Sequence, residues 1–276
     1  MNWTHHTATI NGIRMHFVEE GSGMPVVLCH GFPHLWFSWH RQITALAGAG
    51  YRVIAPDMRG MGQTAAPPEP EAYDIDHITG DLIGLLDHLD IDQAVFAGLD
   101  FGAFDIYDLA LRHPQRVRAV IGLENPAAPH NPDEPPLSEY RRMGQQHFLH
   151  IEYFREPPRA DRELAAEPRR FLHKVFHTLS GAGNYFDCFK HPPGTSYIDA
   201  MAEPPALPWD WLSELELEFF VSEYSRSGFT GGLNWYRSMD IKWAQRKPYE
   251  CVQSEVPAYF LGSENDVDLE GFHGDD

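Results

Sequence analysis

The sequence is short of positive charge. Lys and Arg together number 21, against 40 Asp and Glu, which gives a formal net charge of −19. A balance of this kind disfavours nucleic acid and anionic membrane surfaces as partners and gives no support to an anionic substrate. The composition therefore favours a neutral small molecule as the ligand.

Cysteine and metal-binding patterns are also scarce. The three cysteines, Cys29, Cys188 and Cys251, are widely spaced and form no CxxC pair, which predicts reduced thiols and a cytosolic protein. There is no HExxH motif, and the paired His5 and His6 and the terminal HGDD are expected to be solvated. Because GxGxxG and P-loop motifs are missing as well, we expect a protein that works without a metal or cofactor.

Long hydrophobic runs are missing too. No stretch approaches the roughly 18 uninterrupted apolar residues of a membrane span, and the amino terminus lacks the basic start and apolar core of a signal peptide. No membrane association is therefore expected. A chain of 276 residues is long enough for one large domain that carries an insertion.

Up to about residue 125, short apolar runs alternate with longer helical patterns. The expected helices cover residues 38–47, residues 75–89 and a segment that ends at His113. The expected strands are IRMHFVEEG, PVVLCHG, YRVIAPD, AVFAGL and VRAVIGL. Alternation of this kind predicts an α/β fold with a mostly parallel sheet and helices on both faces.

The composition changes after Asn125. A stretch rich in proline and aromatic residues extends to about Tyr249, without a clear strand, and its helical patterns cover residues 137–154, 162–179, 211–227 and 233–244. Only VPAYFLGSEND then returns to a strand followed by a polar loop. We therefore predict an α/β core at residues 1–128 and 250–276, interrupted by a helical cap at residues 129–249. Ligands of such folds bind at the carboxyl ends of the strands, here beneath the cap.

Asp100 lies between two glycines in GLDFG, where an expected strand gives way to a helix. The pattern has the form of a nucleophile elbow, a strained turn that exposes the central side chain. The alternative is a helix N-cap, for which aspartate is a favoured residue. The turn HGFP, residues 30–33, favours the elbow. In α/β-hydrolases such a turn gives one backbone N–H to an oxyanion hole and the residue after the nucleophile gives another, here Phe32 and Phe101.

The sequence resembles the epoxide hydrolase branch of the α/β-hydrolase superfamily, in particular the hydrolase domain of soluble epoxide hydrolase. The similar segments extend along nearly the whole chain: HGFPHLWFSWHRQITAL, YRVIAPDMRGMGQTAAP, QAVFAGLDFG, LRHPQRVRAV, YFREP and, most specific of all, SGFTGGLNWYRSMD. The resemblance implies an aspartate that attacks a saturated carbon to give an alkyl-enzyme ester. A histidine–acid pair then activates the water that hydrolyses this ester.

Asp100 would be that nucleophile, because a carboxylate is ionised at neutral pH and needs no base for the first step. Tyr236 matches one of two cap tyrosines that donate hydrogen bonds to the epoxide oxygen in the family. The position of the other, three residues before Tyr153, holds His150, so this sequence departs from the pattern. A histidine can donate the same hydrogen bond. The alternative for His150 is a surface residue of a helix. The expected substrate-contacting side chains are those of Trp36, Phe101, His150 and Tyr236.

The resemblance also implies an acid that orients the catalytic histidine. Asp266 follows the last expected strand and is the preferred residue, whereas Asp268 matches the position less well. Glu124 follows the expected strand VRAVIGL, at the other strand end where some relatives place this acid. The alternative interpretation of Glu124 is a loop or helix-capping carboxylate without a catalytic role. The catalytic histidine is expected well downstream of the acid, but only ten residues follow Asp266, and His273 lies too close to serve.

The family's final strand, histidine-containing loop and closing helix thus have no counterpart in the sequence, which favours a truncated chain over a naturally short one. Such a chain is expected to form the ester and to hydrolyse it poorly.

Two other functions fit part of the pattern. A haloalkane dehalogenase would use the same aspartate but usually has a halide-binding tryptophan directly after it, where this chain has Phe101. A non-catalytic binder of hydrophobic ligands would explain the missing histidine and the seven tryptophans and 17 phenylalanines. The sequence favours an enzyme that converts a neutral, apolar epoxide and water to a diol.

Overall fold

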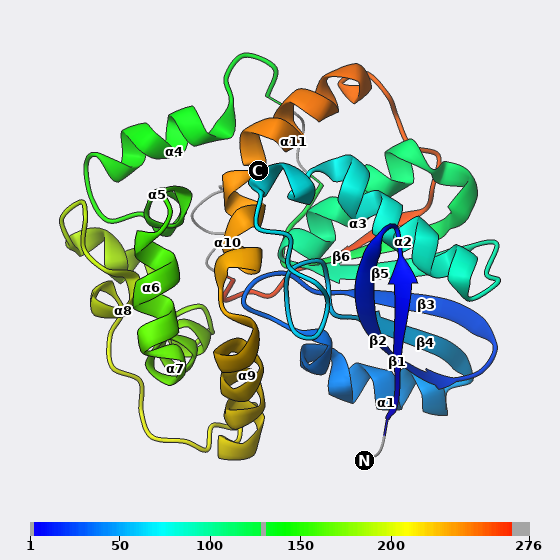
Figure 1. Cartoon of the computed structure of the whole chain (residues 1–276), viewed down its shortest axis with the longest axis horizontal. Coiled ribbons are helices and arrows are strands. Elements are labelled where there is room, and N and C mark those ends of the chain that lie inside the picture. Colours follow the sequence, from blue (N-terminus) through cyan, green and yellow to red (C-terminus); the bar gives the residue numbers. More distant parts are fainter. Residues whose placement is uncertain (1–2, 128–130, 267–276) are drawn as a thin grey trace.

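A computed structural model describes residues 3–127 and 131–266 (Figure 1). Seven strands form one sheet in the order β1-β2-β4-β3-β5-β6-β7. The strands are β1 Thr4–Ile10, β2 Ile13–Gly21, β3 Met24–Cys29, β4 Tyr51–Pro56, β5 Ala94–Leu99, β6 Val117–Leu123 and β7 Ala258–Leu261. β2 pairs antiparallel with both β1 and β4, and the remaining pairs are parallel. The predicted, mostly parallel sheet is therefore confirmed.

Helices cover both faces of this sheet, and alternate residues of β3 pack against the helices on opposite faces. On one face, Val26 and Leu28 of β3 pack with α1 (His40–Gly48) and the preceding turn η1 (Trp36–Trp39). On the other face, Val27 and Cys29 join the larger core with α2 (Ile75–His88) and α3 (Phe101–Arg112). A strand that is buried on both faces needs apolar residues at successive positions, which is why β3 reads as an uninterrupted apolar run.

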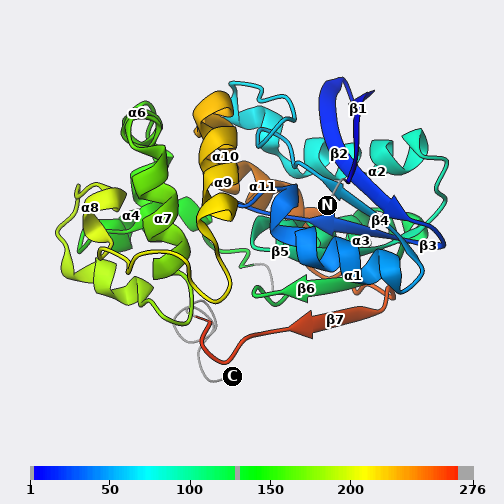
Figure 2. The same cartoon turned by 90° about the horizontal axis from the view of Figure 1, so that it is seen from below.

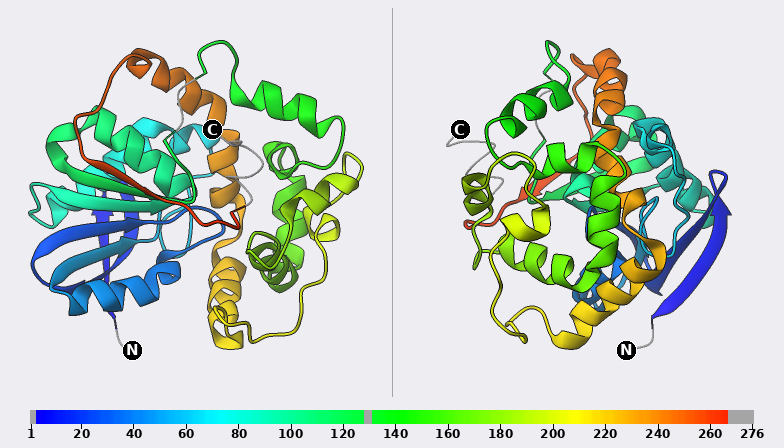
Figure 3. Two further views of the ribbon diagram at one scale, coloured as in Figure 1. Left: turned by 180° about the vertical axis from the view of Figure 1, so that it is seen from behind. Right: turned by 60° about the vertical axis from the view of Figure 1, so that its left-hand side comes forward.

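Between β6 and β7, every regular element of the described residues is helical, and we call this segment, residues 131–257, the helical insertion. Its α-helices are α4 Pro136–Gly144, α5 His150–Arg155, α6 Arg159–Ala166, α7 Pro168–Thr178, α8 Tyr197–Ala200, α9 Glu214–Ser227, α10 Thr230–Arg237 and α11 Met239–Arg246. β6 and β7 point towards the insertion with their carboxyl ends (Figure 2). α9 and α10 stand between the sheet and helices α5 to α8 (Figures 1 and 3).

Three long helices expected in this segment are each divided in two. Pro168 begins α7 rather than continuing α6, because proline has no N–H to donate and fits best at the first position of a helix. α4 ends at Gly144 because Phe148 donates its N–H to the carbonyl oxygen of His191 instead (2.8 Å). α10 gives way to α11 at Ser238, whose hydroxyl donates to the carbonyl oxygen of Tyr73 at 3.1 Å. The last two breaks depend on tertiary contacts that no local pattern contains.

The sequence predicted one edge strand of the sheet, β7, and missed the other, β1. β1 was not expected, because it is half exposed and its short alternating pattern is weak. β7 was expected and is confirmed, and all four of its residues are exposed, including Tyr259 (64 %) and Leu261 (63 %). None of the helices in the described ranges has the length and apolar character needed to cross a bilayer.

Candidate active site

Asp100 occupies the turn between β5 and α3 with a strained backbone. Its φ of 54° and ψ of −130° lie in a region that residues with a side chain rarely adopt, at a cost of roughly 1–3 kcal/mol. Two glycines allow the chain to close around it. A Cβ atom on Gly98 would lie 2.3 Å from the carbonyl oxygen of Gly102, and one on Gly102 would lie 2.5 Å from that of Cys29. The glycines of GLDFG are therefore required by backbone packing.

Replacing Gly98 by alanine is expected to lower the free energy of unfolding by about 1–3 kcal/mol, because the added methyl group has to displace backbone atoms. The matched control is Gly48→Ala, at the exposed end of α1, where an added Cβ meets no atom within 4 Å. That change is expected to leave stability unchanged or to raise it by up to about 1 kcal/mol. Chemical denaturation of both variants measures the difference, and equal stabilities would contradict this reading of the elbow.

The carboxylate of Asp100 is held by the turn that follows β3. The N–H of Phe32 donates to Oδ1 of Asp100 at 2.7 Å. Gly31 packs so closely here that a Cβ would lie 1.8 Å from the same oxygen and 2.6 Å from the backbone nitrogen of Phe101. Asp100 stands at the N-cap position of α3, but its side chain makes no capping hydrogen bond, so capping does not explain the carboxylate. Instead, the backbone nitrogens of Phe32 and Phe101 lie near one carboxylate oxygen, at the positive end of the α3 dipole.

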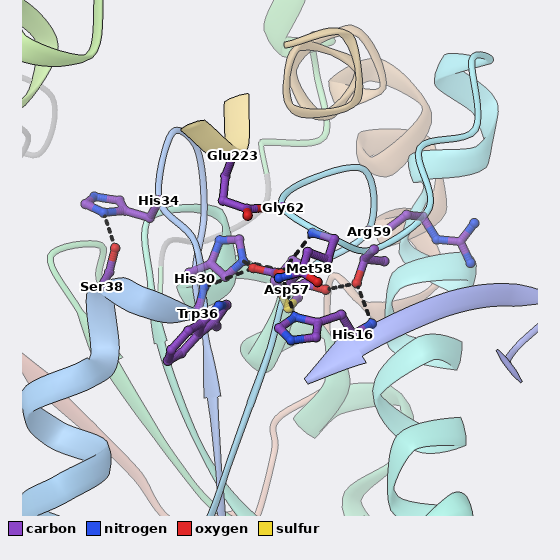
Figure 4. A network of polar contacts seen from close by, with 12 residues as sticks. His16, His30, His34, Trp36, Ser38, Asp57, Met58, Arg59, Gly62 and Glu223 are labelled. Carbon is purple, nitrogen blue, oxygen red and sulfur yellow. Dashed lines mark hydrogen bonds and ion pairs between the residues drawn. The ribbon is translucent and has the colours of Figure 1, made fainter. Parts of the chain in front are cut away.

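Buried polar residues keep this turn in place (Figure 4). His30 donates from Nδ1 to the carbonyl oxygen of Gly31 (2.9 Å) and accepts at Nε2 from the N–H of Met58 (2.9 Å). Burial lowers the pKa of His30, which agrees with a neutral ring that donates at one nitrogen and accepts at the other. Asp57 accepts from Nδ1 of His16 (2.8 Å) and from the N–H of Trp36 (3.2 Å). Both ring nitrogens of His30 are thus engaged in supporting the turn.

A cavity of about 60 Å³ lies over Asp100, between the sheet and the helical insertion. The α/β core contributes Phe32, Pro33, Asp100 and Glu124 to its wall. The insertion contributes one histidine and three tyrosines, which are His150, Tyr185, Tyr197 and Tyr236, together with the apolar side chains of Phe154, Phe171, Val175 and Leu179. Several hydrogen-bond donors therefore share a largely apolar space with two carboxylates, those of Asp100 and Glu124.

Tyr236 reaches this cavity because its neighbours in LNWYR fasten α10 to the core. Trp235 donates from Nε1 to the carbonyl oxygen of Arg59 (2.9 Å), and Asn234 donates from Nδ2 to that of Pro68 (3.0 Å). The ring of Tyr236 is 7 % exposed and lies edge-on to that of His150, with 5.7 Å between the ring centroids. The motif thus combines two residues that hold α10 on the core with one that lines the same cavity as Asp100.

His150 begins α5, and its side chain faces the cavity rather than bulk solvent, so the surface alternative is wrong. Burial lowers the pKa of His150 to about 3, and the ring is neutral at physiological pH. Its Nδ1 shares a hydrogen bond with the hydroxyl of Tyr185, a residue that is 1 % exposed. Sequence reasoning missed Tyr185, because it lies 35 residues further along the chain in a segment that matches no motif.

The two candidate acids lie in different surroundings. Glu124 follows β6 with a φ of 71° and contributes to the wall of the cavity that contains Asp100. Asp266 is half-buried, and its N–H donates to the carbonyl oxygen of Ser263 (3.1 Å). Asp266 is not one of the described residues that line this cavity. Asp268 and His273 lie outside the described residues.

Two aromatic rings expected in the pocket lie elsewhere. Trp36 is 2 % exposed and packs edge-on against Trp3 and Phe219, in the smaller core on the α1 side of the sheet. The ring of Phe101 packs against Trp235 and Tyr236, with centroid distances of 5.5 and 4.7 Å. Neither belongs to the described lining of the cavity. Both rings pack within the cores, and their contact with a substrate stays a prediction.

Comparison with known proteins agrees with this geometry. A family model described as alpha/beta hydrolase fold matches residues 24–173. Epoxide hydrolase A of Mycobacterium tuberculosis is 41 % identical over 95 % of this chain and 82 % of its own length. Epoxide hydrolase 1 of Siraitia grosvenorii is 38 % identical over 95 % and 81 %. The crystal structure of epoxide hydrolase A from Mycobacterium thermoresistibile superposes with a TM-score of 0.93 at 40 % identity, covering 99 % of this chain and 86 % of that one.

Proposed function

Because the chain belongs to the epoxide hydrolases of the α/β-hydrolase fold, we propose that it opens a neutral, apolar epoxide to a vicinal diol through an ester at Asp100. The observation that supports this most is that Asp100, on a strained elbow, shares one small cavity with Tyr236 and His150. The apolar wall formed by Phe154 and Phe171 and the strongly negative net charge favour an uncharged substrate.

The first step is attack of Asp100 on an epoxide carbon. The N–H of Phe32 already engages Oδ1, so Oδ2 is the oxygen that forms the new bond to carbon. As this bond forms, the carbon–oxygen bond of the strained ring breaks and negative charge develops on the epoxide oxygen. Tyr236 and His150 donate hydrogen bonds to that oxygen, which stabilises the charge where it appears. A proton from the donor groups completes the hydroxyl of the bound product.

The second step is attack of water on Cγ of the ester. The charge of the resulting tetrahedral intermediate develops on Oδ1, which accepts from the N–H of Phe32. The N–H of Phe101 is the second donor that we propose for this oxygen. The bond from Cγ to Oδ2 then breaks, so Oδ2 leaves with the diol and an oxygen from water remains in Asp100. This step needs a base to activate the water. His30 is unsuited to that role, because both its ring nitrogens are already engaged in hydrogen bonds, with the carbonyl oxygen of Gly31 and the N–H of Met58.

We propose Asp266 as the carboxylate that orients this base, since it follows the strand next to β6, with Glu124 of the cavity wall as the competing candidate. Because the acid acts only through the base that activates water, Asp266→Asn is expected to prolong the life of the ester in a protein that carries that base, and to leave ester formation unchanged. Glu124→Gln tests the competing candidate in the same way. Single-turnover kinetics of both variants separate the two steps, and a longer-lived ester in Glu124→Gln alone would transfer the role to Glu124.

The function is tested with a small uncharged aryl or alkyl epoxide. We expect formation of the vicinal diol or, if ester hydrolysis is slow, an adduct of the substrate's mass located on Asp100. In water enriched in heavy oxygen, the first turnover should place the label in the enzyme and not in the diol. A matching alkyl halide, with halide release as the measurement, is the control for dehalogenation. A protein that gives neither diol nor adduct with a panel of such epoxides would contradict the proposal.

A further inference from the structure

The contact between His150 and Tyr185 changes what His150 can do. The hydroxyl of Tyr185 and Nδ1 of His150 share a hydrogen bond, and the two rings lie edge-on with 5.2 Å between their centroids. Tyr197 stacks on the imidazole, with 5.8 Å between the ring centroids and an angle of 22° between the planes. The orientation of the imidazole is therefore defined on several sides, and Nδ1 is directed at Tyr185.

Tyr185 itself is held firmly. It begins the short turn η4 (Tyr185–Lys190), whose start is capped by the side chain of Asn184, which accepts from the N–H of Phe186 at 3.0 Å. Its ring packs edge-on against those of Phe186 and Phe189 and is almost entirely buried. Such packing keeps the hydroxyl at one place beside the imidazole, so the contact is part of the architecture of the cavity.

The protonation of the imidazole follows from this arrangement. A neutral histidine carries one ring proton, on Nδ1 or on Nε2, and the partner of the other nitrogen decides which. With Nδ1 engaged by Tyr185, Nε2 is the nitrogen that can meet a substrate in the cavity. To donate there, Nε2 must carry the proton, and Nδ1 must then accept from the hydroxyl of Tyr185.

We propose that Tyr185 and His150 form one composite proton donor, in which Tyr185 donates to Nδ1 and thereby presents Nε2–H of His150 to the epoxide oxygen. The inference rests on the proposed function. A neutral imidazole N–H is a much weaker acid than a phenol, so His150 alone would replace a tyrosine poorly. When Tyr185 donates its hydroxyl proton to Nδ1, the pair as a whole loses a proton as readily as a phenol does, and it donates that proton from the position where the family has its second tyrosine.

The proton transfer balances within the pair. As the ring-opened oxygen takes the proton from Nε2, the hydroxyl proton of Tyr185 moves to Nδ1. Two bonds to hydrogen break and two form, and the product state is a Tyr185 phenolate that accepts from Nδ1–H of a still neutral imidazole. The reverse transfer, with water as the proton source, restores the pair after the diol leaves. Tyr185 acts through His150 and is therefore a positioning residue and proton reservoir.

Tyr185→Phe tests the pair, since it keeps the buried ring and removes only the hydroxyl. We expect ester formation to slow by about 10- to 100-fold, because a general acid contributes roughly 10²- to 10⁴-fold and Tyr236 remains as a donor. Substrate affinity should stay the same. In the His150→Tyr background, the same substitution is expected to change the rate of ester formation less than about threefold, because a tyrosine at position 150 donates its own phenolic proton and does not depend on the hydroxyl of Tyr185. Tyr224→Phe, which alters a buried tyrosine outside the cavity, is the control for general packing effects.

A spectroscopic measurement tests the pair without turnover. Nitrogen-15 NMR of labelled protein, with the His150→Tyr variant to assign the signals, should show protonated Nε2 and unprotonated Nδ1 for His150 at neutral pH. In Tyr185→Phe, the proton should distribute over both nitrogens. A wild-type protein with the proton on Nδ1, or ester formation that is indifferent to Tyr185→Phe, would overturn the inference while the proposed function stands. The expected tautomer in a protein that opens no epoxide would contradict the proposed function itself.

Discussion

Replacing Asp100 by asparagine is expected to slow ring opening by at least about 10⁴-fold, the scale of loss when a nucleophile is removed from an intact site. The amide has nearly the same size and tolerates a positive φ, so the elbow should keep its shape. It lacks the negative charge that lets a carboxylate attack carbon without a base. The change therefore removes the chemistry and leaves the cavity, its apolar wall and its donors in place.

Diol assay and intact mass spectrometry after incubation with an epoxide measure this effect directly, because the wild-type protein should release diol or gain the mass of the substrate and Asp100→Asn should do neither. Asp90→Asn is a close control. Asp90 is also an aspartate with a left-handed backbone, at a φ of 53°, but it is exposed and lies outside the cavity wall. It should form the adduct at the wild-type rate. An adduct on Asp100→Asn at a comparable rate would show that another residue is the nucleophile.

Replacing Tyr236 by phenylalanine is expected to slow ester formation by about 10²- to 10³-fold, the usual loss on removing one donor to a developing oxyanion. The phenyl ring preserves the edge-on packing against Phe101 and His150, so the cavity should not collapse. The missing hydroxyl matters mainly when charge appears on the epoxide oxygen. The rate of ring opening should therefore fall while substrate affinity changes little.

Stopped-flow or quenched-flow measurement of ester formation gives both quantities for Tyr236→Phe. Tyr224→Phe again serves as the matched variant, since its ring stacks on Phe229 at 4.6 Å and its hydroxyl donates to the carbonyl oxygen of His34 (3.4 Å), outside the cavity wall. Epoxides whose leaving oxygen is more stabilised by substituents should lose less on Tyr236→Phe. An equal loss in both variants would attribute the effect to stability and not to the donor.

Several parts of the site could be predicted because they depend on short stretches of sequence. The pattern GLDFG identified the turn at Asp100, since only glycines fit where Gly98 and Gly102 meet neighbouring backbone. HGFP identified the amide of Phe32 for a similar reason, because Gly31 must pass close to the carboxylate. Local backbone geometry restricts which residues are allowed, and such restrictions are visible in a sequence.

Other parts depend on contacts between distant segments. The divisions of the predicted helices at Phe148 and Ser238 follow from hydrogen bonds to His191 and Tyr73, which lie far away along the chain. The ring of Trp36 was expected near the substrate but is held in the core on the α1 face. Side chains of the same chemical kind can face a cavity or a core, and the packing of whole elements decides between them.

The sequence by itself determined the type of sheet, the position of the nucleophilic turn, and the tyrosine and histidine that the helical insertion brings to it. The sheet type and the turn follow from periodicity and from glycines, which act over a few residues, whereas the tyrosine and the histidine were implied by the resemblance of the LNWYR and YFREP segments to the epoxide hydrolases. Only the tertiary structure placed Tyr185 on His150 and Glu124 in the wall of the same cavity as Asp100. A hydrogen bond across 35 residues depends on where two elements are packed in space, and that is decided by the whole core at once.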